Sequence, residues 1–176
     1  LLLLAPSGAL AVSPLIVDDA DTVERGRLQL NLVWYFDHAS DRQSSLVPVN
    51  PALGLTSRGE VSLTFGYLRE QFDEPVPDTA SGPFDLLLGT KWKLFRSDGG
   101  LQLTGRMDVK FPSASESRRL GTGDTDIGGF LIATRCWGHT CFDWNVGYVA
   151  HALAADTSSD DAWFLGQAVR YSATES

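Results

Sequence analysis

Apolar and polar residues alternate along most of this chain, and this alternation constrains its fold more than any other feature. In residues 101–111, the clearest case, the apolar positions are Leu101, Leu103, Met107, Val109 and Phe111, and the polar ones are Gln102, Thr104, Arg106, Asp108 and Lys110. A period of two residues is typical of a β-strand, because successive side chains of a strand point to opposite faces. A helix would repeat its apolar positions every three to four residues.

The same alternation recurs in eight segments, most of them near eleven residues long. They are residues 27–37, 46–55, 60–68, 84–95, 101–111, 125–135, 141–151 and 162–172. Pro48 and Pro51 lack the backbone donor that a sheet needs, so we expect segment 46–55 to be bent or imperfectly paired. Strands of soluble proteins are commonly ~5–6 residues long, whereas tilted strands that cross a bilayer need ~9–11. The strand lengths therefore favour a membrane.

The connections between these segments alternate between long and short. The long ones are residues 38–45, 71–83, 112–124 and 152–161, and the short ones are 56–58, 96–99 and 136–140. Outer-membrane barrels have short periplasmic turns and longer external loops. The sequence therefore predicts an all-β protein, an up-and-down antiparallel transmembrane β-barrel with about eight visible strands, in the bacterial outer membrane.

The alternation alone does not say whether the apolar face meets lipid or forms a core. Aromatic residues near the ends of the apolar faces, among them Trp34, Trp92 and Tyr148, are typical of interfacial girdles. The polar faces carry small polar residues and isolated charges of both signs, which suits a confined lumen. The alternative is a soluble or filled barrel that binds an apolar ligand, lined by residues such as Leu103 and Met107.

The charged residues on the polar faces are the candidates for lining the lumen. They are Arg27, Glu60, Asp85, Lys91, Arg106, Asp108, Lys110, Asp126, Asp143 and His151. Closing the hairpin about Ser97 and Asp98 predicts that Asp85 lies opposite Lys110 and Lys91 opposite Thr104. Closing the next hairpin about Gly138 predicts the pairs Asp126 with His151 and Thr134 with Asp143. Such ladders either neutralise one another inside a narrow barrel or select the solute.

The two cysteines and the net charge exclude some functions. Cys136 and Cys141 are the only cysteines, and an oxidising compartment would let them form a disulfide across a tight turn. A reduced redox or metal pair is the alternative, although a zinc site would lack ligands because only His139 lies between them. The formal net charge of −8 and the lack of a basic stripe argue against binding nucleic acid.

The amino-terminal residues 1–11 resemble the remnant of a secretory signal peptide, with an apolar run followed by Ala9-Leu10-Ala11. We expect the barrel domain to occupy residues 12–176. After residue 11, no apolar run approaches the ~20 residues that a membrane-spanning helix needs.

Motifs for catalysis are missing. There is no Gly-x-Ser-x-Gly elbow, dinucleotide fingerprint or calcium loop, so we expect no catalytic residue, metal or cofactor. A third hypothesis, an outer-membrane esterase-like enzyme, would use Ser113, Ser115 and His151 near the rim. Nothing in the pattern places a base and an orienting acid beside these serines.

Four stretches resemble the outer-membrane family labelled meta-pathway of phenol degradation, whose members are often called transporters. They lie in residues 14–26 (PLIVDDADTVERG), 82–93 (GPFD and GTKWK), 110–126 (KFP and GTGDTD) and 145–148 (NVGY). The resemblance implies a Gram-negative outer-membrane barrel that admits small hydrophobic or aromatic compounds, with no established catalytic residues. Its partners would be outer-membrane lipid and a small-molecule solute. Family members usually have further strands, so we expect the barrel to be incomplete at the carboxyl end.

Overall fold

The computed structural model describes residues 17–39, 42–72, 78–151 and 161–172, and these residues form one antiparallel sheet. Its strands are β1 (Leu28–Leu32), β2 (Tyr35–His38), β3 (Arg42–Gly54), β4 (Gly59–Phe72), β5 (Asp78–Pro83), β6 (Leu86–Arg96), β7 (Leu101–Phe111), β8 (Asp126–Trp137), β9 (Thr140–His151) and β10 (Ala162–Tyr171). A single 3-10 turn, η1 (Glu116–Arg118), lies between β7 and β8. The predicted all-β class is confirmed.

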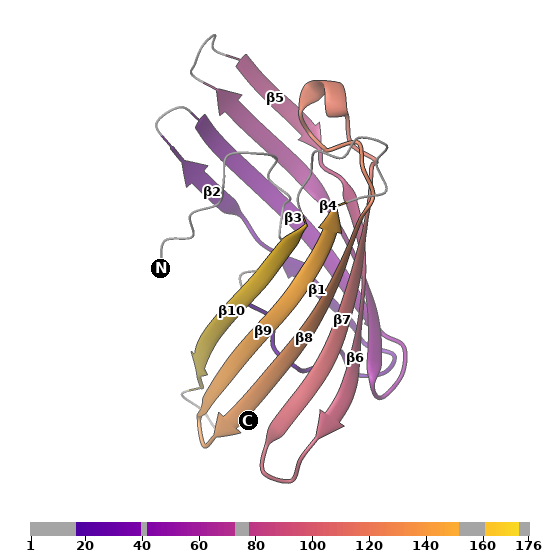
Figure 1. Ribbon diagram of the computed structural model, residues 1–176, viewed down its shortest axis with the longest axis vertical. Coiled ribbons are helices and arrows are strands. Elements are labelled where there is room, and N and C mark those ends of the chain that lie inside the picture. Colours follow the sequence, from indigo (N-terminus) through magenta and orange to yellow (C-terminus); the bar gives the residue numbers. More distant parts are fainter. Residues whose placement is uncertain (1–16, 40–41, 73–77, 152–160, 173–176) are drawn as a thin grey trace.

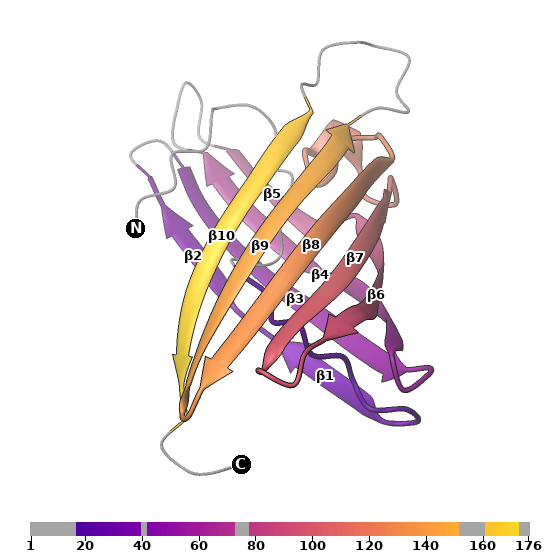
Figure 2. The same cartoon turned by 60° about the horizontal axis from the view of Figure 1, so that its bottom comes forward.

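The strands follow an up-and-down order. β1 and β2 both pair with β3, and β5 and β6 both pair with β4, so each of these two pairs forms one interrupted strand. The sheet therefore has eight strand positions along the path β1-β3-β4-β6-β7-β8-β9-β10. It curls into a half-barrel (Figures 1 and 2), and among the described residues no ladder joins β10 to β1 or β2.

Two of the expected long connections are mostly strand. β3 begins at Arg42 directly after residues 39–41, and β4 and β5 extend to Phe72 and from Asp78. The polar composition of residues 38–45 and 71–83 concealed these extensions, which carry the hairpins beyond the other strands (Figure 1). The ladder between β3 and β4 skips Asn50 and Pro51, in agreement with imperfect pairing at the prolines.

The predicted register is right in one hairpin and wrong in the other. Between β8 and β9, Asp126 lies opposite His151 and Thr134 opposite Asp143, as predicted. Between β6 and β7, Lys91 lies opposite Arg106 rather than Thr104, and Lys110 lies opposite Leu87 rather than Asp85. The turn runs from Ser97 to Gly100, later than assumed, and the register shifts between Lys93 and Phe95. The partners of residues 86–93 therefore move by two positions, and these side chains keep their faces.

The polarity of the two faces of the sheet is the reverse of that in a soluble protein. Along β8, the inward residues Asp126 and Thr134 are buried, while the outward residues Ile127, Leu131 and Trp137 are exposed. Further buried polar residues line the concave face, namely Thr64, Lys91, Thr104, Asp108, Asp143 and Asn145. Large exposed apolar residues cover the convex face, among them Leu88, Trp92, Leu94, Met107, Trp144, Val146, Tyr148, Leu165 and Val169. The sheet is thus polar inside and apolar outside.

Candidate functional site

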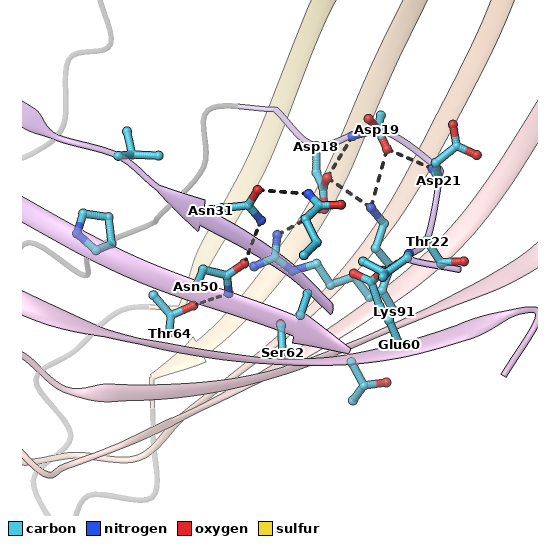
Figure 3. A pocket seen from close by; sticks show the side chains of 17 residues that line it. Asp18, Asp19, Asp21, Thr22, Asn31, Asn50, Glu60, Ser62, Thr64 and Lys91 are labelled. Atoms are coloured by element: carbon cyan, nitrogen blue, oxygen red, sulfur yellow. Dashed lines mark hydrogen bonds and ion pairs between the residues drawn. The ribbon is translucent and has the colours of Figure 1, made fainter. Parts of the chain in front are cut away.

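The amino-terminal residues 17–24, which we call the strap, cross the concave face of the sheet without joining it as a strand (Figure 3). Ala20 lies at the centre of the strap and is fully buried. Its N–H donates to Thr134 Oγ1 at 2.8 Å, and its carbonyl accepts from Thr104 Oγ1 at 2.5 Å. Both backbone groups of Ala20 are therefore satisfied by hydroxyls of β7 and β8, as burial requires.

A side-chain amide of β9 binds the backbone of Asp18 in the strap. The N–H of Asp18 donates to Asn145 Oδ1 and Asn145 Nδ2 donates to the carbonyl of Asp18, both at 2.8 Å. The amide thus pairs with both backbone groups of one residue, in the way that a neighbouring strand would. These bonds fix the register of the strap on the concave face of the sheet, which we call the wall.

The carboxylates of the strap meet cations that project from the wall. Lys91 Nζ lies 3.1 Å from Asp18 Oδ1 and 3.7 Å from Asp19 Oδ1. Arg106 Nη1 lies 3.5 Å from the second oxygen of Asp18, and Lys93 Nζ lies 3.7 Å from Asp21 Oδ1. The side chain of Lys91 is only 8% exposed, so an unpaired charge would be costly there and the strap carboxylates stabilise it.

Two arginines of the wall also have carboxylate partners within the wall. Arg106 Nε and Nη2 lie 3.0 and 2.8 Å from the two oxygens of Asp108, in the bidentate geometry of a strong charge-assisted pair. Arg170 Nε and Nη2 bind Asp143 at 2.7 and 3.1 Å, while its Nη1 lies 3.4 Å from Asp19 Oδ2. Each arginine therefore joins the wall to the strap.

A second charged cluster lies at the other end of the concave face, under the β7–β8 loop (residues 112–125). Asp85 accepts backbone N–H bonds from Ala114 at 2.8 Å and Thr122 at 3.3 Å. Lys110 Nζ contacts Asp126 and Thr122 Oγ1 and lies 3.9 Å from Asp85 Oδ2. These groups anchor the loop to the ends of β6, β7 and β8.

A polar cavity of about 320 Å³ lies between the strap and strands β1, β3, β4, β6 and β7 (Figure 3). Charged residues of its wall include Glu60, Lys91 and Arg106, and Glu60 Oε2 accepts the N–H of Val23 from the strap. Amides and hydroxyls make up much of the remainder, including Gln29, Asn31, Asn50, Ser62, Thr64 and Thr90. This volume is within the range of small-molecule sites, and the polar groups could hydrogen-bond a solute.

Two aromatic rings lie on the concave face beside the ion pairs. The ring centroids of Phe130 and Phe164 are 6.1 Å apart in an edge-to-face arrangement, and the Arg106 guanidinium carbon lies 5.5 Å from the Phe130 centroid. Gly147 makes room for the Phe130 ring, because an added Cβ would lie 2.1 Å from it. The interior therefore offers an apolar surface next to a cation.

The sequence-predicted residues fall into two groups, two single residues and the cysteine pair. Glu60, Lys91, Arg106, Asp108 and Asp143 surround the strap, and Asp85, Lys110 and Asp126 lie under the β7–β8 loop. Arg27 belongs to neither buried group, and its exposed side chain lies 2.9 Å from Glu24 at the end of the strap. His151 ends β9, but its side chain is outside the described part. Cys136 and Cys141 form a disulfide across the β8–β9 turn.

Sequence reasoning missed the strap itself, together with Arg170, Thr104 and Asn145 as its partners. Residues 17–24 show no periodicity, and their contacts with β9 lie 127 positions away in the sequence. The one available signal was charge: the acidic stretch Asp18-Asp19-Ala20-Asp21 is complementary to the lysines and arginines of the polar strand faces. The residues of the signal peptide expected at 1–11 lie outside the described part.

The serines of the esterase-like hypothesis serve local structure. Ser113 Oγ accepts the N–H of Leu86 at 2.9 Å, and Ser115 Oγ lies 3.2 Å from Ser117 Oγ. Within the described ranges, no three His, Cys, Asp or Glu side chains are grouped so that they could hold a metal ion. In the same ranges, no helix has the length and apolar character needed to span a membrane.

Comparison with known proteins places the chain in no family. No protein-family model matches the sequence, and no curated protein is significantly similar to it. The fold and the interior geometry therefore carry the functional argument.

Proposed function

We propose that this chain is an outer-membrane β-barrel channel through which small solutes pass passively. The observation that carries the proposal is the inverted polarity of the sheet. Its concave face buries Lys91, Asp108 and Asp143 in hydrogen-bonded pairs, whereas its convex face exposes leucines, tryptophans and tyrosines. Exposed apolar surfaces of this extent mark contact with a membrane or a partner.

The position of the aromatic residues supports a lipid contact. Trp137, Phe142 and Trp144 cluster at the end of the sheet with the short turns, and Tyr148 packs on Trp163 nearer the opposite end. Aromatic girdles at the two membrane–water interfaces flank the apolar band of transmembrane barrels. The alternative soluble barrel would need Met107 inside, but this side chain is 51% exposed on the convex face.

The finer part of the proposal concerns the solutes, which we infer to be small hydrophobic or aromatic compounds. It is supported by the resemblance to the meta-pathway family and by the interior rings of Phe130 and Phe164 beside Arg106. A planar aromatic compound could pack on these rings while the polar wall binds its substituents.

Heat-modifiable gel mobility tests the proposal directly. The full chain is refolded with and without detergent micelles, and each sample is run with and without boiling. We expect a compact, heat-sensitive band only with detergent, because the convex face needs an apolar solvent. A folded monomer in plain buffer would contradict the membrane assignment. Conductance after insertion into a planar bilayer then tests passage, and a folded, inserted chain without conductance would contradict the channel.

A further inference from the structure

The strap binds the wall through its carboxylate side chains, as a ligand with carboxylate groups would. Two adjacent carboxylates, Asp18 and Asp19, are held by Lys91, Arg106 and Arg170 from three different strands. The side chains of Lys91 and Arg106 are 8% and 15% exposed, so these cations belong to a built interior site rather than to a solvated surface. Buried cations of this kind need an anionic partner.

The wall alone does not neutralise its own cations. Four of them contact strap carboxylates, namely Lys91, Lys93, Arg106 and Arg170. Against these the wall offers Asp108, Asp143 and, at the far end of the strap, Glu60. Lys91 in particular has no wall carboxylate within ion-pairing distance in the described residues, and its two partners are both in the strap. Departure of the strap would remove both carboxylate partners of Lys91.

The surroundings of these cations suit a small organic anion. The cavity of about 320 Å³ opens beside Lys91 and Arg106, and hydroxyls and amides line it. The Phe130 ring, 5.5 Å from the Arg106 guanidinium, supplies an apolar surface next to the charge. A carboxylate could take the place of the Asp18 side chain on Lys91 and Arg106, with its organic body in the cavity or on the ring.

We propose that the Lys91–Arg106–Arg170 cluster is a binding site for a small organic carboxylate, and that Asp18 and Asp19 of the strap occupy this site in the absence of solute. The inference deepens the proposed function, on which it rests for the route of the solute, by naming the solute class and the competing group. Strap and solute bind the same cations, so each displaces the other.

Binding to strap variants tests this proposal without any transport measurement. In the full chain, Asp18→Asn/Asp19→Asn weakens the competitor and leaves the backbone bonds of the strap in place. The probe is benzoate, and benzylammonium is the matched control because it has the same ring and the opposite charge. The readout is the temperature at which the compact band is lost, at constant ionic strength. A ligand that binds only the folded state raises this temperature.

We expect benzoate to raise the transition of the double variant by at least about 2 °C more than that of the unmodified chain, and benzylammonium to have no effect. Adding Lys91→Gln to the double variant should abolish the benzoate effect. Equal effects of benzoate and benzylammonium, no benzoate effect in the double variant, or an unchanged effect with Lys91→Gln would each overturn the proposal.

A fallback variant covers the case in which the double variant does not fold. If the double variant gives no compact band, Asp18→Asn alone takes its place, because it weakens the group that competes on Lys91 and Arg106 while Asp19 stays 3.7 Å from Lys91, and the same outcomes apply. The failure of the channel would appear as a folded chain without conductance, whereas the failure of this inference would appear as a missing benzoate effect in a folded chain. The two failures are therefore distinguishable.

Discussion

Two segments outside the strands cover the concave face of this sheet, and different interactions hold them. The β7–β8 loop places Leu120, which is 3% exposed, into an apolar cluster with Leu68, Ala80 and Phe84. The strap instead places three aspartates against lysines and arginines, and its one fully buried apolar side chain is the methyl group of Ala20. An apolar cluster, together with the backbone hydrogen bonds to Asp85, holds the loop, whereas ion pairs and hydrogen bonds hold the strap.

The kind of interaction decides whether a solute can displace the strap or the loop. Apolar burial is non-directional, and only another apolar surface can replace it, so the loop is a permanent part of the fold. Ion pairs and hydrogen bonds within a polar interior can be replaced by those of a solute or of water. The strap is therefore the cover that a charged solute is able to displace, and the loop is not.

The largest effect is expected on the convex face of the sheet. The strap and the β7–β8 loop both lie on the concave face, so a variant on the convex face is the reference for variants of either one. Leu131→Arg places a charge at the middle of β8 on the exposed apolar face. In lipid vesicles it should lower the free energy of unfolding by about 2–4 kcal/mol, because arginine is costly near the bilayer midplane. Urea unfolding in vesicles measures this. Asp98→Arg, at an exposed position of the turn between β6 and β7, is the control and should change little; equal effects would contradict a lipid-facing β8.

Removing the apolar anchor of the loop comes next. Leu120→Ala should destabilise the β7–β8 loop by about 2–3 kcal/mol, at the low end for a buried leucine because the small cluster can partly collapse. Arg118 and Arg119 lie in this loop, so trypsin should cleave there faster. Leu165→Ala, at a position that is 77% exposed on β10, is the control and should leave cleavage unchanged. An unchanged rate with Leu120→Ala would mean that the apolar cluster does not hold the loop.

The strap should respond to the loss of one polar anchor. Asn145→Ala removes both bonds to the backbone of Asp18, and the cost of about 1–2 kcal/mol corresponds to roughly tenfold more frequent release. Ala20→Cys reports release, because residue 20 is fully buried and the two native cysteines are in a disulfide. Maleimide labelling of this thiol should accelerate about tenfold with Asn145→Ala. Asn50→Ala, whose side chain bonds Asn31 and Thr64 instead of the strap, should not accelerate it. Equal rates in both variants would contradict the anchoring role.

The sequence predicted which face of the sheet is polar and which is apolar, but it did not predict the segments that pack on the concave face. Alternation in residues 101–111 assigned the inward and outward positions of this strand, because a strand repeats every two residues regardless of its partner. Register depended on the turn, so the misplaced centre of Ser97–Gly100 moved Lys91 from Thr104 to Arg106. The strap offered only its acidic charge as a signal, since contacts between Asp18 and Asn145 join distant segments and leave no local pattern. What sequence can predict here is what the backbone period dictates.

The smallest effect, and the most direct test of the comparison, is that of salt. Raising sodium chloride from about 0.05 to 1 M should screen the partly exposed pairs Arg170–Asp19 and Lys93–Asp21, while the buried Lys91–Asp18 pair is screened less. Strap release should therefore rise only about two- to fivefold, which is less than about 1 kcal/mol. Labelling of Ala20→Cys measures it, and Ala114→Cys, packed against the Leu120 cluster, is the matched reporter for the loop. Apolar burial does not weaken in this salt, and the Asp85 carboxylate that accepts the Ala114 N–H is buried and little screened, so labelling at position 114 should change little. If salt accelerated both reporters equally, the two covers would share one kind of interaction; acceleration at position 20 alone would separate a cover held by charge from one held by an apolar core.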